Sequence, residues 1–341
     1  MGLFDFFTSD IAIDLGTANT LIITKDKVVV DEPSIIAINK INNKVLAIGR
    51  DAMQMHEKTH DNIRTIRPLK DGVIADFTAA EQMIRGMIKM IDTGNRFFTP
   101  NHRMVICIPS GITEVELRAV KDSAHRAGAK EVYMIYEPIA AAIGLGIDIA
   151  KPYGTMVVDI GGGTTEIAVI ALSGIVTDQS IRVAGDVFSK DILDYMRRQH
   201  NLLIGERTAE RIKIEVGSAL TELDNPPEDY EVRGRDLMTG IPKVINVSYS
   251  EISFALDKSI TKIEEAVLKV LETAPPELSA DIYETGINLT GGGALLRGLD
   301  KRLSMKTKLP VKVAEDPLRA VVRGTGETLK DLEKYKGVLM S

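Results

Sequence analysis

Apolar and polar residues alternate with a period of two over residues 11–48, and polar turns at 24–27 and 39–43 interrupt the alternation. A period of two is that of a half-buried strand, so this part predicts several antiparallel strands. Apolar residues then follow at spacings of three and four, which predicts one buried face of a helix. They are Phe77, Ala80, Met83, Ile84, Met87, Ile88 and Ile91.

Strands and helices alternate over the next segment. The pattern predicts a strand over 104–108, a helix from about 113 to 127 that ends at Gly128, a strand over 131–135 and an alanine-rich helix after Pro138. Such alternation is typical of an α/β layer with mixed strand directions.

The second half repeats this scheme. A hairpin over 155–172 precedes helices near 186–200 and 206–220, a loop at Pro226-Pro227 and short strands to about residue 247. A long helix over roughly 250–272 ends before Pro275-Pro276. A strand over 286–290 then enters Gly291-Gly292-Gly293, a glycine turn that we expect to lead into a helix.

Composition limits the class of protein. The chain has 341 residues, 44% hydrophobic and 26% charged, with a formal net charge of −6. This describes a globular protein with room for two domains, and the acidic balance argues against nucleic acid as a main partner. No stretch is long enough to span a membrane, and no secretory signal precedes the first strand. Cys107 lies in an apolar run, so we expect a buried thiol in a cytosolic protein.

Two short segments have nearly the same sequence pattern. Residues 11–20 and 157–165 each run from an apolar strand into an aspartate, Asp14 or Asp159, and then into a turn of small and hydroxyl-bearing residues. The two aspartates are about one domain length apart. The repetition indicates an internal duplication.

The chemistry of these segments favours a phosphate and a hard cation. Small turn residues let backbone N–H groups approach an anion, and Thr17, Thr20, Thr164 and Thr165 add hydroxyls. A carboxylate beside a phosphate is repulsive unless a cation such as Mg²⁺ lies between them. The alternative is a pair of ordinary hairpins with surface aspartates, because Asp-x-Gly is common in turns. No Gly-x-x-x-x-Gly-Lys-Ser/Thr motif is present, which excludes a P-loop.

Five motifs in register resemble the actin-like ATPases, and within them the bacterial MreB family. They are Asp14-Leu15-Gly16-Thr17-Ala18-Asn19-Thr20, Glu137-Pro138-Ile139-Ala140-Ala141-Ala142, Asp159-Ile160-Gly161-Gly162-Gly163-Thr164-Thr165-Glu166, Ala209-Glu210-Arg211-Ile212-Lys213 and Leu289-Thr290-Gly291-Gly292-Gly293-Ala294. The resemblance covers essentially the whole chain. Unlike eukaryotic actin, the first turn continues as Thr20-Leu21-Ile22 without a lysine.

The resemblance implies an α/β actin-like fold with duplicated RNase H-like cores in two lobes that flank a nucleotide cleft. Lobe I would span residues 1–145, with an insertion at about 33–66, and a C-terminal helix over 316–341 would pack back on it. Lobe II would span residues 146–315, with an insertion at about 182–245.

The resemblance also implies a site for ATP and Mg²⁺. Asp14 would hold the metal through water, and Asp159 would face it from the other lobe. The nucleotide would be held by the first turn, the second turn, the motif at 210–213 and the last glycine turn. These residues are Thr17, Ala18, Asn19, Gly161, Gly162, Gly163, Thr164, Glu210, Arg211, Ile212, Lys213, Gly291, Gly292, Gly293, Ala294 and Leu295.

Hydrolysis requires a water molecule in line with the γ-phosphate and a group that orients it. By the resemblance, Glu137 polarises this water with Thr164 as its partner, and Asp159 completes the catalytic set. Glu137 also begins a predicted helix, so the alternative is a carboxylate that only complements the helix dipole.

The implied activity is slow ATP hydrolysis coupled to filament assembly. The expected partners are further copies of the chain in paired protofilaments, the inner face of the cytoplasmic membrane, and cell-wall synthesis and membrane scaffold proteins, for a role in rod cell shape. Phe97 and Phe98 beside Arg96, and the cluster of Phe4, Phe6 and Phe7, are the candidate membrane contacts. The alternative is that both clusters pack on the core.

Two other classes share the duplicated core. A chaperone-type ATPase continues into a long substrate-binding region, which we do not expect because this sequence stops at Ser341 soon after its last predicted helix. A sugar or acetate kinase stays open, and transfer of phosphate to a metabolite rather than to water would distinguish it.

His56-Glu57-Lys58-Thr59-His60 matches the His-Glu-x-x-His motif of zinc peptidases. Two histidines four residues apart on a helix share a face and could bind zinc. The flanking residues lack a long apolar face and no third ligand is evident, so we favour a solvated helix.

Overall fold

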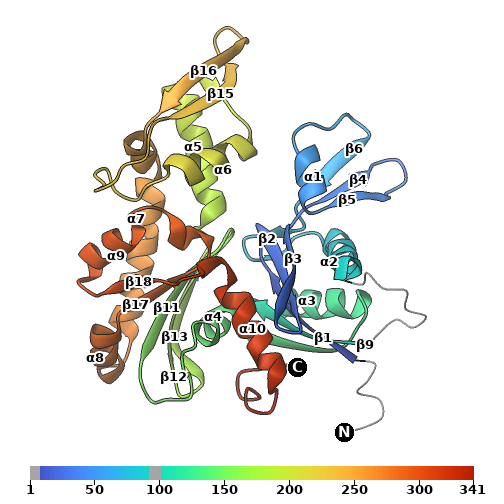
Figure 1. The fold of residues 1–341 in the computed structure, drawn as a ribbon, viewed down its shortest axis with the longest axis vertical. Helices are drawn as coiled ribbons and strands as arrows, with labels where there is room; N and C mark the ends of the chain where they lie inside the picture. The colour runs from blue at the N-terminus through green and yellow to red at the C-terminus, as the bar shows by residue number, and fades with distance from the viewer. Residues whose placement is uncertain (1–7, 92–100) are drawn as a thin grey trace.

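Two five-stranded sheets form the centre of the molecule (Figure 1). The computed structural model describes residues 8–91 and 101–341. The first sheet has the order β10-β9-β1-β2-β3. Its strands are β1 (Thr8–Leu15), β2 (Asn19–Thr24), β3 (Lys27–Pro33), β9 (Asn101–Ile108) and β10 (Ala129–Tyr136). We call the half built on this sheet lobe I.

The second sheet repeats the first. Its order is β13-β12-β11-β17-β18, and we call the half built on it lobe II. Its strands are β11 (Thr155–Ile160), β12 (Thr165–Ala171), β13 (Gly174–Ile181), β17 (Ile287–Thr290) and β18 (Val311–Val313). In both sheets three antiparallel strands come first in sequence, and the first of them pairs in parallel with a later strand, which pairs in parallel with one more. The duplication predicted from the two aspartate segments is therefore confirmed.

Helices cover the outer face of each sheet. In lobe I they are α2 (Phe77–Ile91) and α3 (Glu114–Arg126), and in lobe II they are α5 (Gly185–Gln199) and α7 (Tyr249–Thr273). Capping boxes begin two of them, because Thr113 and Ser248 each exchange hydrogen bonds with the glutamate three residues later. The helices α8 (Pro276–Thr285) and α9 (Leu299–Thr307) lie at the edge of lobe II.

Two helices of small residues lie between the sheets. They are α4 (Glu137–Gly144) and α10 (Ala320–Lys330), and residues of both share one buried cluster with the inner faces of the two sheets. A side chain at Gly144 would overlap the carbonyl oxygen of Ala320, and one at Gly324 would overlap that of Ala140. The two lobes therefore rest on a close helix crossing that admits no Cβ at these glycines.

The C-terminal segment packs on lobe I, with Val322 against Ala12 and Leu21. Its helix is shorter than the predicted range of 316–341: α10 runs from Ala320 to Lys330, and turns follow. The tail then reaches β10, where the backbone of Met340 pairs with that of Met134.

Each lobe carries a smaller unit at the same end of the molecule (Figure 1). In lobe I it comprises β4 (Ile36–Asn39), β5 (Val45–Ile48), β6 (Ile63–Ile66) and α1 (Arg50–Met55). In lobe II it comprises β14 (Leu202–Leu203), β15 (Tyr230–Asp236), β16 (Pro242–Val247) and α6 (Glu206–Val216). A short hairpin of β7 (Leu69–Lys70) and β8 (Val73–Ile74) follows the first unit. The boundaries that we proposed for the lobes and their insertions remain a proposal.

The glycine turn after β17 differs from the prediction. Gly292–Leu295 forms a single 3₁₀ turn, η2, and the α-helix begins only at Leu299. Gly291, with φ 78°, and Gly298, with φ 74°, both have a positive φ, which favours glycine. A further 3₁₀ turn, η3 (Pro317–Arg319), precedes α10.

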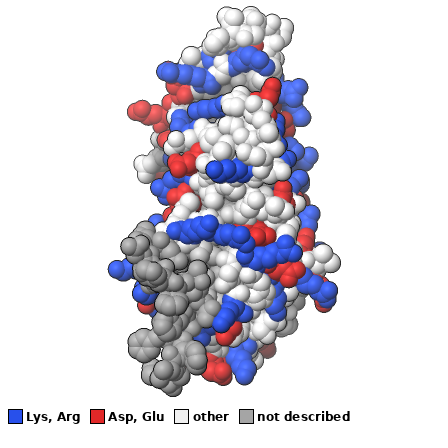
Figure 2. Space-filling view, turned by 90° about the vertical axis from the view of Figure 1, so that its right-hand side faces the viewer, with Lys and Arg blue, Asp and Glu red and all other residues white. Residues whose placement is uncertain are grey.

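The flank of lobe I carries charges of both signs (Figure 2). Arg85 and Lys89 of α2 and Arg118 and Arg126 of α3 are exposed, while Asp and Glu side chains lie among the basic ones. Within residues 8–91 and 101–341, none of the helices is long and apolar enough to cross a lipid bilayer.

Candidate functional site

The two aspartate turns face each other across the lobes. On β1, Ile11, Ile13 and Leu15 pack against the outer helices, so the alternation of the strand turns Ala12 and Asp14 toward the inner side. On β11, Met156, Val158 and Ile160 pack outward, whereas Val157 and Asp159 face inward. Each carboxylate thus stands at the end of a buried strand on the side where the lobes meet.

Glycines allow the turns to approach closely. A Cβ at Gly162 would lie 2.6 Å from Ala18 Cβ, and a Cβ at Gly163 would lie 2.5 Å from Thr17 Oγ1 and 2.8 Å from the backbone nitrogen of Gly72. The structure therefore brings Thr17 and Ala18 of the first turn against Gly162 and Gly163 of the second. The backbone of the second turn is closed by a hydrogen bond from Gly161 N to Thr164 O, 2.9 Å long.

The four threonines of the turns have different roles. Thr20 pairs its hydroxyl with Ser34 Oγ at 2.8 Å, and Thr165 donates to the carbonyl of Val183 at 2.7 Å. Both hydroxyls are engaged in hydrogen bonds within their own lobe, so their predicted role as phosphate donors is wrong. Thr17 Oγ1 accepts the N–H of Gly72 at 2.9 Å, and Thr164 lies beside Gly72.

The tip of the β7–β8 hairpin enters the space between the two turns. Asp71, with φ 52°, and Gly72, with φ 79°, form a left-handed turn that places the Gly72 backbone against Thr17 and Thr164. Sequence reasoning missed this hairpin. An Asp-Gly pair does signal a turn, but the pair does not say which surface the turn contacts.

Four carboxylates lie close to one another at the meeting of the lobes: Glu137, Asp159 and Glu166 are buried and Asp14 is half-buried. Burial raises the pKa of Asp14 to about 6 and that of Asp159 to about 7. Burial, and then the charges of Glu166, Asp159 and Asp14, raise the pKa of Glu137 well above its ordinary value. Among the described residues, no cationic side chain contributes to the pKa shift of Asp14, Glu137 or Asp159.

This excess of negative charge fits a divalent cation. Mg²⁺ prefers oxygen ligands, keeps several waters and is usually held by one or two carboxylates together with substrate phosphates. Asp14 and Asp159 could hold such an ion, because their carboxylates face the two turns from opposite lobes and the charge of Asp14 raises the proton affinity of Asp159. A bound cation would lower the pKa of both groups.

Glu137 is the first residue of α4 and is buried at the floor between the lobes. Burial is the main cause of its elevated pKa, and the charges of Glu166, Asp159 and Asp14 add to the rise, so Glu137 lies within electrostatic reach of both aspartates. Glu166, the fourth carboxylate, accepts hydrogen bonds from Ser110 N at 3.0 Å, Ser110 Oγ at 2.8 Å and Ser180 Oγ at 2.6 Å. It therefore joins the loop after β9 in lobe I to β12 and β13 in lobe II.

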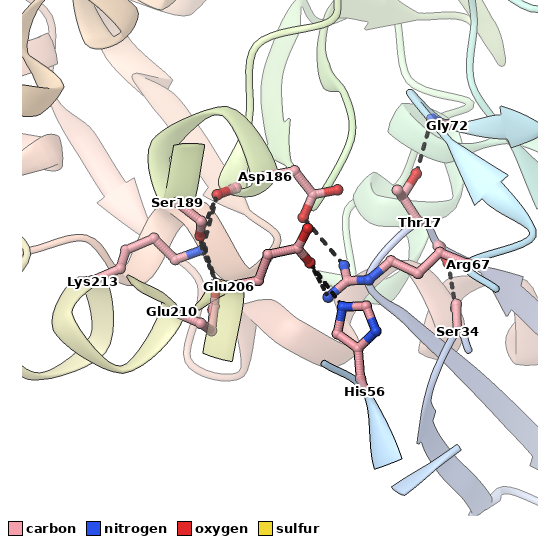
Figure 3. A network of polar contacts seen from close by, with 12 residues as sticks. Thr17, Ser34, His56, Arg67, Gly72, Asp186, Ser189, Glu206, Glu210 and Lys213 are labelled. Carbon is pink, nitrogen blue, oxygen red and sulfur yellow. Dashed lines mark hydrogen bonds and ion pairs between the residues drawn. The ribbon is translucent and has the colours of Figure 1, made fainter. Parts of the chain in front are cut away.

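The motif at 210–213 lies on α6 and divides between two environments. Lys213 Nζ contacts Glu210 Oε2 at 2.6 Å, Gly185 O at 3.0 Å and Ser189 Oγ at 3.2 Å, as Figure 3 shows. Arg211 is exposed, and the side chain of Ile212 is buried in the core of lobe II. Of this motif, only Glu210 and Lys213 thus belong to the polar network beside the second turn. Gly185 connects the two, because it accepts a hydrogen bond from Lys213 and its own N–H donates to the carbonyl oxygen of Gly161.

The last glycine turn lies directly behind Asp159. A Cβ at Gly291 would lie 2.9 Å from Asp159 Oδ1, and a Cβ at Gly293 would overlap Ile160. Gly292 approaches Leu318, Ala294 is buried and Leu295 is 55% exposed. The structure therefore brings this turn beside the second aspartate turn, with Leu295 at the surface.

The His-Glu-x-x-His segment is neither a zinc site nor a solvated helix. The helix α1 ends at Met55, His56 is extended and Glu57 has φ 61°, so His56 and His60 do not share a helix face. In the part of the chain that the structure describes, no group of three or more His, Cys, Asp or Glu side chains could hold a metal ion. The prediction of a helix here is wrong because the chain reverses at Glu57.

The segment instead contacts the other lobe (Figure 3). His56 Nδ1 lies 2.7 Å from Thr65 Oγ1, and its Nε2 lies 3.2 Å from Glu206 Oε2. Glu57 Oε1 accepts the backbone N–H of Glu206 at 3.1 Å. Arg67 reaches Glu206 Oε2 at 3.4 Å and Asp186 Oδ1 at 3.8 Å. The first turns of α5 and α6 are thus held from lobe I.

The predicted membrane contacts lie outside the described residues. Phe97 and Phe98 fall within 92–100, and Phe4, Phe6 and Phe7 within 1–7.

The duplicated sheets and the two facing turns define a nucleotide-binding protein of the actin-like class. A crystal structure of MreB 5 of Spiroplasma citri bound to AMPPNP matches the fold with a TM-score of 0.90 and 40% identity, over 96% of this chain and 97% of that one. A MamK double helical filament matches the fold alone, with a TM-score of 0.78 and 21% identity, over 95% of this chain and 99% of that one.

Sequence comparison narrows the class to a family. The model of the MreB/Mbl protein family matches residues 8–337. The cell shape-determining protein MreB of Escherichia coli (strain K12) is 49% identical over 340 residues, which is 98% of this chain and 97% of that protein. The cell shape-determining protein Mbl of Bacillus subtilis (strain 168) is 50% identical over 329 residues, 96% of this chain and 98% of that protein. The chain belongs to the MreB/Mbl family, a family of cytoskeletal, cell-shape-determining proteins, and the kinase alternative is not favoured.

Proposed function

We propose that the protein binds Mg·ATP between its lobes, hydrolyses it slowly and couples the nucleotide state to filament assembly. The observation that carries the proposal is the pair of facing turns, Thr17-Ala18 against Gly162-Gly163, flanked by two carboxylates that no cationic side chain of the described residues neutralises. The solved relative bound to AMPPNP supports the nucleotide.

Binding follows from the donors of the turns. Backbone N–H groups of Thr17, Ala18, Gly162 and Gly163 would contact the β- and γ-phosphates, with Asn19 and Gly161 at the ends of the two turns. Mg²⁺ would neutralise phosphate charge between Asp14 and Asp159, which replaces the lysine that actin carries after its first turn. Glu210, Lys213 and the turn over Gly291–Leu295 would surround the adenosine, with Arg211 at the rim and Ile212 supporting α6 from the core.

Hydrolysis follows from the floor of the site. Glu137 would accept a hydrogen bond from the attacking water, Thr164 would hold that water from lobe II, and Asp159 would fix the metal side of the γ-phosphate. Because burial and three neighbouring carboxylates raise the pKa of Glu137, it needs the bound cation to be an effective acceptor at neutral pH. This dependence would make ATP hydrolysis slow whenever the metal is absent.

Assembly would place the smaller units of one subunit against the base of the next. Such a head-to-tail contact need not close into a ring, so it generates a filament. Nucleotide would bias the angle between the lobes and hence the shape that assembles. We extend the proposal to paired protofilaments on the inner face of the cytoplasmic membrane, where cell-wall synthesis and membrane scaffold proteins would bind.

Three measurements on the purified chain test the proposal. We expect ATP binding that requires Mg²⁺, phosphate that passes only to water when metabolites are offered, and sedimentable filaments above a critical concentration with ATP. Binding without metal dependence, or pelleting that ignores nucleotide and concentration, would overturn it.

A further inference from the structure

The buried thiol of Cys107 contacts Asp14, the aspartate of the first turn. Its Sγ lies 3.2 Å from Asp14 Oδ1 and 3.5 Å from the carbonyl oxygen of Ile13. Cys107 is 3% exposed and stands directly beside Asp14, because β9 pairs in parallel with β1 in that register. The shorter distance makes the carboxylate the main acceptor of the S–H.

Thr290 occupies the equivalent position in the other half. Its Oγ1 donates to Asp159 Oδ1 at 2.7 Å, and β17 pairs in parallel with β11 so that Thr290 stands directly beside Asp159. Thr290 is fully buried. The two halves therefore place a small hydrogen-bond donor at one and the same point of the duplicated sheet, although the residues differ in kind.

The donors are unusual for their surroundings. Inner-face neighbours such as Val105 on β9 and Val157 on β11 are apolar, and Cys107 packs in the same cluster, so the hydrogen bond of its thiol comes in addition to its packing. Among the described residues, these two contacts are the only side-chain hydrogen bonds to Asp14 and Asp159. In each case Oδ1 is engaged and Oδ2 is left without a hydrogen-bonding partner from the described chain.

We propose that Cys107 and Thr290 are equivalent positioning residues, one in each half, that orient Asp14 and Asp159 toward the magnesium-bound phosphates. The inference rests on the proposed function of the site and adds to it the pair of residues that hold its carboxylates. A hydrogen bond to Oδ1 limits rotation of the carboxylate, so that Oδ2 points to a metal-bound water without a further entropic cost.

The expected effect is a weaker response to metal. Loss of a group that orients a metal ligand typically weakens metal affinity by about tenfold. We therefore expect removal of either donor to raise the free Mg²⁺ concentration at half-saturation of ATP binding by about tenfold. In excess EDTA the variants and the wild type should bind the nucleotide equally weakly, because the two donors act through the aspartates that hold the metal.

Matched variants separate the donor from its volume. Thr290→Val keeps the shape and removes the hydroxyl, and Thr290→Ser keeps the hydroxyl. Cys107→Ala removes the thiol, and Cys107→Ser restores a donor. The full-length protein is titrated with Mg²⁺ in the presence of a fluorescent ATP analogue, and thermal unfolding without nucleotide checks that each variant is folded.

The proposal predicts a raised Mg²⁺ requirement for Thr290→Val and Cys107→Ala, with Thr290→Ser and Cys107→Ser within about twofold of the wild type. It is overturned if Thr290→Val matches the wild type, or if the serine variants are as weak as the variants without a donor. If Cys107→Ala fails to fold, the comparison of Thr290→Val with Thr290→Ser tests the proposal. A wild-type protein whose ATP binding ignores Mg²⁺ would instead refute the proposed function itself.

Discussion

Arg67 is a side chain of lobe I that contacts both α5 and α6 of lobe II. Its guanidinium bridges Glu206, the first residue of α6, and Asp186, in the first turn of α5. Burial raises the pKa of Asp186, and the charge of Arg67 counteracts that rise. Replacement by alanine removes both ion pairs and leaves two carboxylates facing lobe I without their cation.

The free energy that the two ion pairs contribute follows from the exposure of the three side chains. The side chain of Arg67 is 30% exposed, that of Asp186 43% and that of Glu206 49%. Partly exposed ion pairs contribute about 0.2–1 kcal/mol each. Two pairs and the packed arginine stem therefore amount to about 1 kcal/mol. Since about 1.4 kcal/mol corresponds to a factor of ten, Arg67→Ala should speed nucleotide release roughly threefold to tenfold.

Stopped-flow displacement of a fluorescent ATP analogue by excess ATP measures this rate. Arg118→Ala is the matched control, because Arg118 is 77% exposed and, within the described parts of the chain, pairs only with Glu114 on its own helix. Its release rate should equal that of the wild type. The reasoning is refuted if Arg67→Ala also releases nucleotide at the wild-type rate while folding normally.

Four further predictions test other parts of the account. Glu137→Ala should keep Mg·ATP binding and lose most phosphate release, which a coupled phosphate assay measures; unchanged turnover would remove Glu137 from the catalytic role. Without metal and nucleotide, the folded protein binds more protons than the unfolded chain between about pH 4 and 7, because burial raises the pKa of Asp14 to about 6 and that of Asp159 to about 7. Its melting temperature should therefore fall as pH rises through this window, and Mg·ATP should stabilise it most at the alkaline end; a melting temperature that rises over the window would contradict the burial of these carboxylates. Gly324→Val should destabilise the fold by about 3 kcal/mol or more, since the side chain would overlap Ala140 at the crossing of α4 and α10, whereas Gly337→Ala, in open space, should be nearly neutral in urea unfolding. Phe97→Ser with Phe98→Ser should reduce flotation with liposomes relative to the wild type, and equal flotation would exclude this pair as the main membrane contact.

Local pattern predicted most of the elements because each depends on nearby residues. The alternation around Asp14 placed β1, and the apolar spacing from Phe77 to Ile91 placed α2. The duplication could be inferred because the same strand-aspartate-turn sequence occurs twice, and the sheet orders confirm it. The pairing of Asp14 with Asp159 followed from that repetition.

What the sequence could not reveal depends on contacts between distant segments. His56 and Glu57 match a helical metal motif, yet a left-handed residue at Glu57 breaks the helix and the side chains bind the first turn of α6. Thr20 and Thr165 have the composition of phosphate donors, but their hydroxyls bind Ser34 and Val183. The Gly72 turn enters the site from a hairpin that shares no motif with it.

The central claim is that one magnesium-bound triphosphate lies between Asp14 and Asp159. A crystal of the protein grown with AMPPNP and Mn²⁺ in place of Mg²⁺ tests it through anomalous scattering. The account predicts a single manganese peak between the two carboxylates, in contact with phosphate oxygens and bridged to Asp14 by water. A peak elsewhere, or a nucleotide that lies outside the facing turns, would contradict it.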